Sequence, residues 1–270
     1  MNLVIQGPSL TETLATELGL PERIADHAFR LRNFPARDSV SSWCEKHRVD
    51  HAWMAEGRRF GDLKLVAMDM DSTLITMETI DELGDLVGKK PEIAAITARA
   101  MRGEIDYPES LRQRVSLLAG LGEEGLLEVY EKRLKLTSGA ETLIAACKRH
   151  GVKLLLVSGG FTFFVERLKK RLGIEYTIAN ALEVSRGRLT GGLVGEIVDA
   201  EAKARKFRSV VKELAAARDQ TVAIGDGAND LKMMAAAGLS IAFHAKPVVR
   251  AQASCALTWS GLDGVLNLFE

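Results

Sequence analysis

The sequence predicts an α/β protein: a parallel sheet covered by helices, with a helical insertion and a small α+β domain at the N-terminus. From residue 63 onward, short apolar runs alternate with segments of helical period, which is typical of parallel strands joined by helical crossovers. After the first run, the chain is helical by period up to residue 136. This stretch is too long for a simple crossover, so we interpret residues 76–136 as an inserted cap.

Residues 1–62 are predicted to form the small N-terminal domain. Their pattern indicates a strand at Leu3–Ile5, helices at 11–18 and 40–47, and a hairpin-like segment that ends at Gly61. The residues do not identify the role of this domain. Three interpretations remain open: a regulatory domain that binds an amino acid, a dimerisation element, or a brace for the core.

Residues 63–270 are predicted to form the core around the cap. Helix 140–150 has a basic last turn followed by Gly151, a residue suited to the left-handed conformation that often ends a helix. Two β-like pieces lie within 176–198, and we expect a small β insertion at about 180–196. The other expected elements are strands at 63–68, 152–157, 221–224 and 240–243, and helices at 162–172, 200–217 and 230–237.

Composition and charge exclude several classes of protein. Hydrophobic residues make up 47% of the 270 residues, which excludes a disordered or low-complexity chain. Basic and acidic residues both number 36, so no overall positive field is available for nucleic acid or an anionic membrane. No apolar run reaches the roughly 20 residues that span a bilayer, and the N-terminus lacks the pattern of a secretory signal. We therefore expect neither a nucleic-acid nor a membrane partner.

The cysteines point to a reducing compartment. Cys44, Cys147 and Cys255 are odd in number, lie far apart and form no CxxC pair, so we expect no disulfide framework and a cytoplasmic location. Cys44 with His47 and His51 suggests a metal cluster, but His51 lies past the expected helix end and no fourth ligand is evident. A zinc site there is therefore disfavoured. The oligomeric state stays open, a homodimer included.

Two carboxylates follow the first core strand. Asp69 and Asp71 lie in the stretch DMDST, and they would point the same way if the strand continued. The carboxyl ends of parallel strands are where open α/β sheets bind ligands. Like charges this close repel each other, so a bound cation would compensate them. The alternative is a strand-to-helix turn in which the polar residues act as caps.

A second polar loop follows the strand at 152–157. Ser158, Gly159 and Gly160 place a hydroxyl and flexible backbone before a helix N-terminus, an arrangement that suits a phosphate oxygen. By itself, this loop is better explained as a plain turn. Lys203, farther along the chain, taken alone is an ordinary solvated lysine on a helix.

A third polar loop, GDGAND at 225–230, follows the strand at 221–224. Asp226, Asn229 and Asp230 would meet the earlier polar residues at the same sheet edge, which packing alone explains poorly. The alternative is a loop whose Asp230 caps the next helix.

Together, the four signals are far more specific than any one of them. DMDST, SGG, Lys203 and GDGAND resemble, in order, the four motifs of the haloacid dehalogenase superfamily. Within it, the stretch 69–85, SLRQRVSLL, VSGGF, GDGANDLKMM and FHAKP resemble the phosphoserine phosphatases. The resemblance runs from about residue 63 to the C-terminus. It implies a doubly wound parallel sheet with the Rossmannoid core of this superfamily, and a helical cap.

The resemblance also implies an activity: Mg²⁺-dependent hydrolysis of O-phospho-L-serine through an aspartyl-phosphate, the last step of serine biosynthesis. Asp69 would be the nucleophile, and Asp71 would protonate the leaving oxygen and then activate water. The magnesium ligands would be Asp69, the backbone carbonyl of Asp71, and Asp226. Asp230 would position Lys203. The implied phosphate and substrate contacts are Ser158, Gly159, Lys203 and Asn229.

Glu78 and Arg114 carry the expected substrate specificity. By resemblance they would bind the ammonium and the carboxylate of phosphoserine, the latter through the planar fork of the guanidinium. Arg112 would face elsewhere on the same helix, so we prefer Arg114. Without the motifs, Glu78 and Arg114 would each be explained as a charged side chain on the solvent-exposed face of a helix. Tyr107 and Met101 are further cap residues that would line the cavity, and the alternative, more common for such residues, is simple core packing.

Three functions remain open from the sequence. The first is the phosphatase described above, and the second is a related capped phosphatase or a phosphotransferase, for example from phosphoserine to homoserine. The third is a phosphoserine-binding sensor without turnover, which the presence of both Asp69 and Asp71 disfavours. A formal GxGxxG at 120–125 follows a helical stretch instead of a strand, so a dinucleotide site is not expected there.

Overall fold

The computed structural model describes all 270 residues. Its centre is a seven-stranded sheet with the order β11-β10-β9-β5-β6-β7-β8, in which every neighbouring pair is parallel except β7 with β8. The predicted α/β fold with a mostly parallel sheet is therefore confirmed. The strands are β5 (Leu65–Asp69), β6 (Lys153–Phe161), β7 (Tyr176–Ser185), β8 (Arg188–Val194), β9 (Thr221–Gly225), β10 (Leu239–Phe243) and β11 (Cys255–Leu257).

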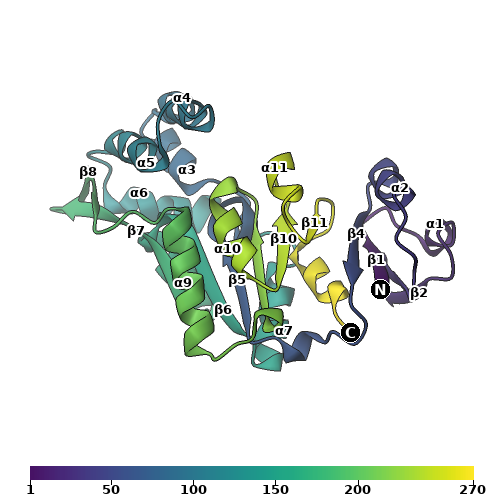
Figure 1. Cartoon of the computed structure of the whole chain (residues 1–270). Helices are drawn as coiled ribbons and strands as arrows, with labels where there is room; N and C mark the ends of the chain where they lie inside the picture. The colour runs from purple at the N-terminus through teal and green to yellow at the C-terminus, as the bar shows by residue number, and fades with distance from the viewer.

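Helices cover both faces of this sheet (Figure 1). Alternate residues of β5 explain why, because Leu65 and Ala67 belong to one apolar cluster and Val66 and Met68 to another. The first cluster includes residues of α9 (Ala200–Glu213) and α10 (Leu231–Ala236), and the second includes residues of α7 (Ala140–His150) and α8 (Thr162–Leu172). This two-sided burial makes the sheet doubly wound. Further helical segments of the core include α11 (Pro247–Arg250) and the 3₁₀ segments Arg218–Gln220, Ala228–Asp230 and Leu262–Leu268.

The insertion after β5 consists of four α-helices, which Figure 1 shows beyond one end of the sheet, and the π-helical segment Val129–Arg133. Its two connections to the core run side by side: Ile75 forms a β-bridge with Leu136, and the amide of Thr76 donates to the carbonyl of Lys135. The insertion therefore leaves and rejoins the core through a narrow neck. The helices are α3 (Thr79–Leu86), α4 (Lys90–Met101), α5 (Tyr107–Ser116) and α6 (Glu123–Glu128).

The β-like pieces expected at 176–198 are one core strand that extends into a hairpin. β7 pairs in parallel with β6 from Tyr176, and from Ala181 it pairs antiparallel with β8. The hairpin also contacts the cap through two backbone hydrogen bonds. The amide of Gly120 donates to the carbonyl of Leu189, and the amide of Leu189 donates to the carbonyl of Leu121. The cap thus has a backbone attachment to the core besides its neck.

The N-terminal residues form a separate antiparallel sheet of order β2-β3-β1-β4. The predicted strand and the second predicted helix are present, but the helix expected at 11–18 spans only Glu12–Ala15. The hairpin expected before Gly61 is wrong. The elements are β1 (Asn2–Gln6), α1 (Glu12–Ala15), β2 (Glu22–Ala25), β3 (Ala28–Leu31), α2 (Ser39–His47) and β4 (Asp50–Met54).

The reason for that error is the partner of the strand at Asp50–Met54. It pairs with β1, more than forty positions earlier, and the local hairpin is instead β2 with β3. Alternation of apolar residues identifies a strand but not the strand it pairs with. No helix of the structure combines the length and the apolar stretch that a membrane crossing requires.

The N-terminal sheet is fastened to the end of the chain. The buried carboxylate of Asp50 accepts hydrogen bonds from the amides of Thr258, Trp259 and Ser260, at 2.6–3.3 Å. Arg30, also buried, donates to the carbonyl of Phe269 at 2.7 Å. Figure 1 accordingly shows both chain ends on this side of the molecule, away from the cap.

Candidate active site

The polar loops predicted from the sequence meet in one cavity of about 560 Å³ between the cap and the carboxyl ends of β5, β6 and β9. Both sides contribute side chains to its wall. From the predicted set, the lining residues are Asp69, Asp71, Glu78, Tyr107, Met101, Arg114, Gly159, Asp226 and Asn229. Arg112 is exposed on the same helix as Arg114 and does not line the cavity.

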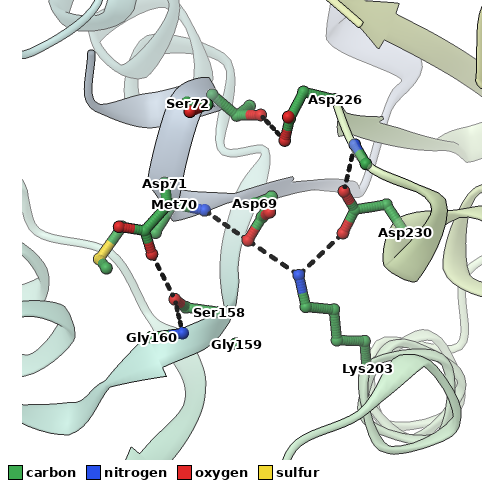
Figure 2. Close-up of polar contacts among 12 residues, drawn as sticks. Asp69, Met70, Asp71, Ser72, Ser158, Gly159, Gly160, Lys203, Asp226 and Asp230 are labelled. Carbon is green, nitrogen blue, oxygen red and sulfur yellow. Dashed lines mark hydrogen bonds and ion pairs between the residues drawn. The ribbon is translucent and has the colours of Figure 1, made fainter. Parts of the chain in front are cut away.

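Asp69 lies at the last position of β5, beside a fully buried lysine (Figure 2). Its Oδ1 accepts hydrogen bonds from the amide of Met70 at 2.8 Å and from Nζ of Lys203 at 2.9 Å. Oδ2 has no protein partner. One carboxylate oxygen is therefore held in place, and the other is free to react or to bind a cation.

Lys203 is held between two carboxylates. Its Nζ lies 2.9 Å from Asp69 and 2.8 Å from Asp230, and both Lys203 and Asp230 have no exposed side-chain surface. Burial alone lowers the pKa of Lys203, but the charges of Asp230 and Asp69 outweigh it and raise the pKa above its ordinary value. The lysine is therefore a permanent cation. Asp230 also accepts from the amide of Gly227 at 3.2 Å, so both of its oxygens are engaged.

Asp71 does not continue the strand. After Asp69 the chain turns, and Ser72 takes a left-handed φ of 55°, so the two carboxylates line the same cavity from a turn and not from one strand face. Asp71 accepts from the amide of Thr79 at 2.7 Å and from Oγ of Ser158 at 3.3 Å. Burial and the nearby charge of Glu78 raise the pKa of Asp71 to about 7. Such a carboxyl group can hold or release a proton near neutral pH.

The loop after β6 is organised around Ser158. Its Oγ donates to Asp71 and accepts from the amide of Gly160 at 2.8 Å. Ser158 is fully buried and does not line the cavity, whereas Gly159 and Gly160 do. In this arrangement the glycine backbone, not the serine hydroxyl, faces the cavity.

Three carboxylates approach one another at the base of the cavity. Asp69, Asp226 and Asp230 each offer an oxygen within 4.8 Å of the other two. Burial, followed by repulsion from Asp230, raises the pKa of Asp226 to about 6, and burial likewise raises that of Asp69. Because Lys203 and Gly227 engage Asp230, the oxygens left for a cation belong to Asp69 and Asp226. Hard oxygen donors with excess negative charge fit a divalent ion such as Mg²⁺.

Glu78 and Arg114 face the cavity from the cap side. Glu78 precedes α3 and accepts from Oγ of Ser72 at 2.6 Å, and Arg114 lies on α5 with its Nε donating to the carbonyl of Ser110 at 3.3 Å. Both Glu78 and Arg114 line the cavity, and neither forms a salt bridge with a protein residue, so both charges are available to a ligand. The cap side of the cavity therefore carries an anion and a cation, and the loop at 158–160 contributes to the core side.

Several site residues were not found from the sequence. Thr79 contributes a backbone amide to Asp71, and Thr73 donates its hydroxyl to Asp226 at 3.5 Å. Asn180, buried on β7, donates to the carbonyl of Gly159 at 2.8 Å. Thr73 belongs to the DMDST stretch and was open to prediction. The contacts of Thr79 and Asn180 depend on how the chain folds back on itself, which no local sequence pattern indicates.

Cys44, His47 and His51 have separate surroundings. Cys44 packs in the small N-terminal core. The ring of His47 lies 4.8 Å from that of Trp43 at an interplanar angle of 42°, and Nε2 of His51 lies 3.2 Å from the hydroxyl of Ser41. These contacts account for the three side chains without a shared ligand.

The three cysteines should resist alkylation in the native protein. Burial raises the pKa of Cys44, Cys147 and Cys255 to about 12, so the reactive thiolate is scarce at pH 8. Iodoacetamide followed by mass spectrometry should show almost no labelling in buffer and three labels in denaturant. Fast labelling of any one thiol in buffer would contradict the packing described here.

Comparisons with known proteins identify the family of the chain. Residues 66–235 match the family model described as haloacid dehalogenase-like hydrolase. A phosphoserine phosphatase of Polaromonas sp. is 53% identical over 217 residues, which cover 78% of this chain and 92% of the relative.

Two solved structures are also similar. A probable phosphoserine phosphatase from Vibrio cholerae, in unliganded form, superposes with a TM-score of 0.87 at 35% identity, covering 99% of this chain and 86% of the other. A substrate-bound phosphoserine phosphatase complex gives a TM-score of 0.72 at 39% identity, covering 77% and 99%.

Proposed function

Because the chain belongs to the haloacid dehalogenase-like hydrolases, we propose that it is a phosphoserine phosphatase. It hydrolyses O-phospho-L-serine to L-serine and phosphate through an aspartyl-phosphate, as the last step of serine biosynthesis. The observation that carries the proposal is the cavity in which Asp69 has one free oxygen and in which Glu78 and Arg114 stand opposite. The similar phosphoserine phosphatases support it.

Asp69 is the nucleophile. Its free Oδ2 attacks phosphorus, the bond from phosphorus to the serine oxygen breaks, and the phosphoryl group is held on Asp69. Lys203 fixes the other oxygen and offsets negative charge as the phosphoryl group approaches. The backbone of Gly159 and the side chain of Asn229 hold the phosphate in line for the attack.

Asp71 transfers the proton. It gives a proton to the leaving serine oxygen and then takes one from the water that cleaves the acyl-phosphate, since the two half-reactions run in opposite proton directions. The amide of Thr79 and the hydroxyl of Ser158 hold its carboxylate for both steps. Ser158 thus supports the phosphate loop and the acid, and Asp230 holds Lys203 in place.

The metal of the site is Mg²⁺ in this proposal. The residues that would bind it are Asp226, through its carboxylate, Asp71, through its backbone carbonyl, and Asp69, through a carboxylate oxygen. When bound, it neutralises charge on the phosphate oxygens and on the carboxylates. A reducing cytoplasm is the location that the free cysteines and a biosynthetic role favour.

One assay separates this function from its two rivals. Purified protein with Mg²⁺ is given a panel of small phosphomonoesters, and released phosphate is measured with and without homoserine. Phosphate release from phosphoserine above the other esters supports the phosphatase. Phosphohomoserine as the main product identifies a transferase, and tight phosphoserine binding without release identifies a sensor.

Substrate recognition gives a separate prediction. Losing a charge-assisted hydrogen bond costs roughly 1.5–3 kcal/mol, so Glu78→Gln and Arg114→Ala should each lower kcat/KM for phosphoserine by about 10- to 150-fold. A simple aryl phosphate has neither an ammonium nor a carboxylate, so Arg114→Ala should barely change its hydrolysis, and Glu78→Gln should affect it only through the lower pKa of Asp71. The exposed Arg112→Ala is the matched control on the same helix. Equal losses on both substrates would make Glu78 or Arg114 a structural residue.

A further inference from the structure

Tyr107 reaches from the cap to the loop that faces the phosphate. It is the first residue of α5, and its hydroxyl donates to the carbonyl of Gly159 at 3.2 Å. Burial raises the pKa of Tyr107, so the hydroxyl stays protonated and able to donate. The aromatic ring needs no hydroxyl to line a cavity. Packing of the ring therefore does not explain the hydrogen bond from Tyr107 to Gly159.

The carbonyl of Gly159 has a second donor, from the core. Asn180 donates its Nδ2 to it at 2.8 Å, and Oδ1 of Asn180 accepts from the amide of Val198 at 2.8 Å. A carbonyl oxygen accepts two hydrogen bonds, so the cap and the core each supply one. Asn180 belongs to the sheet that also carries Gly159, whereas Tyr107 belongs to the cap.

The same peptide leads to the proposed acid. The peptide that joins Gly159 to Gly160 has the carbonyl of Gly159 and the amide of Gly160. This amide donates to Oγ of Ser158 at 2.8 Å, and Ser158 donates to Asp71 at 3.3 Å (Figure 2). A continuous hydrogen-bonded chain thus runs from Tyr107 through the Gly159–Gly160 peptide and Ser158 to Asp71. Members of such a chain polarise and orient one another.

The space around Gly159 fits the hydroxyl closely. A Cβ at this position would collide with Oη of Tyr107, and the next neighbours, Cζ of Tyr107 and Nδ2 of Asn229, would be at ordinary contact distances of 3.5 and 4.0 Å. Gly159 does not have a positive φ, so its backbone alone would accept alanine. The hydroxyl of Tyr107 is thus the group that requires glycine here.

We propose that Tyr107 is a positioning residue that couples closure of the cap to the geometry of the phosphate loop and of Asp71. The proposal rests on the phosphatase function proposed above. With the cap closed, Tyr107 and Asn180 both donate to the carbonyl of the Gly159–Gly160 peptide; with the cap open, Asn180 is its one remaining donor. Water exclusion and alignment of the loop then occur together, which is the purpose of a closing cap.

The test is a double-mutant cycle of Tyr107→Phe and Gly159→Ala, with Tyr130→Phe as the control on another cap segment. Tyr107→Phe keeps the ring and loses one hydrogen bond, so kcat/KM for phosphoserine should fall about 2- to 12-fold. Gly159→Ala should be more damaging in the wild type than in the phenylalanine background, because the colliding hydroxyl is then absent. Tyr130→Phe should match the wild type.

Two further measurements keep the outcomes distinct. Calorimetric binding of inorganic phosphate with Mg²⁺ should weaken in Tyr107→Phe, although phosphate touches neither Glu78 nor Arg114, and hydrogen exchange should quicken at 107–116. Full activity and phosphate binding in Tyr107→Phe, or additive effects in the cycle, would overturn the proposal. A wild-type protein inert on phosphoserine would refute the phosphatase function, and the phosphate-binding cycle would then decide the role of Tyr107.

Discussion

Asp69→Asn should abolish phosphoserine turnover while leaving the fold intact. The amide has the shape of the carboxylate but lacks the negative oxygen that attacks phosphorus, and losing a nucleophile lowers turnover by roughly 10,000-fold or more. Lys203 keeps its second partner, Asp230, so the buried cation is not left unpaired. Circular dichroism and the melting temperature should confirm a folded protein, and Asp62→Asn, at an exposed position, is the control.

The same variant identifies the covalent intermediate. Wild-type protein mixed with ³²P-phosphoserine and quenched in acid should carry label on the peptide that contains Asp69, and hydroxylamine should release it as expected of an acyl-phosphate. The Asp69→Asn protein should carry no label. Label on Ser72 or Ser158 would replace this mechanism with attack by a hydroxyl.

Local signals explain which elements could be predicted. The helices at 140–150 and 162–172 were predicted to the residue because each ends with basic residues and then a glycine in the left-handed region, Gly151 at φ 71° and Gly173 at φ 64°. The helix expected at 200–217 ends at Glu213 instead. The alanines that follow are good helix formers, but Ala215 takes a φ of 45° as the chain turns toward β9.

The site was predictable where residues share a strand end and not where they come from elsewhere. Strand order alone brings Asp69, Ser158 and Asp226 to one edge, since the carboxyl ends of β5, β6 and β9 are adjacent. Lys203 is different. Only tertiary folding brings its ammonium within 2.9 Å of Asp69, so its sequence neighbourhood is that of a surface lysine, and resemblance alone singled it out.

The contacts of the Gly159–Gly160 peptide show the same limit more sharply. Tyr107 and Asn180 reach it from the cap and from the point where β7 leaves the core sheet. Neither residue lies in a motif that implies a hydrogen bond. Their roles follow from the topology. A sequence pattern predicts the helices and strands but not which of their side chains come into contact.

Removing the metal should abolish activity as completely as removing the nucleophile. EDTA should stop phosphate release and excess Mg²⁺ should restore it, because Asp69, Asp226 and the phosphate bring together negative charge that Lys203 alone does not offset. Ca²⁺ should bind and inhibit, since it prefers more ligands and looser geometry than an in-line transfer tolerates. Full activity in EDTA would contradict the metal assignment.

Asp226→Asn tests the same assignment without an activity measurement. Burial and repulsion from Asp230 raise the pKa of Asp226 to about 6, so its charge destabilises the metal-free fold at pH 7.5. Removing that charge should raise the melting temperature of the metal-free protein by several degrees, given about 2–4 °C per kcal/mol for a chain of this size. Wild-type protein should be stabilised by Mg²⁺, because a ligand that binds only the folded state favours it, whereas Asp226→Asn should show little further shift. If the variant gains as much from Mg²⁺ as the wild type, Asp226 is not a ligand and the cation must be held by other oxygens of the cavity.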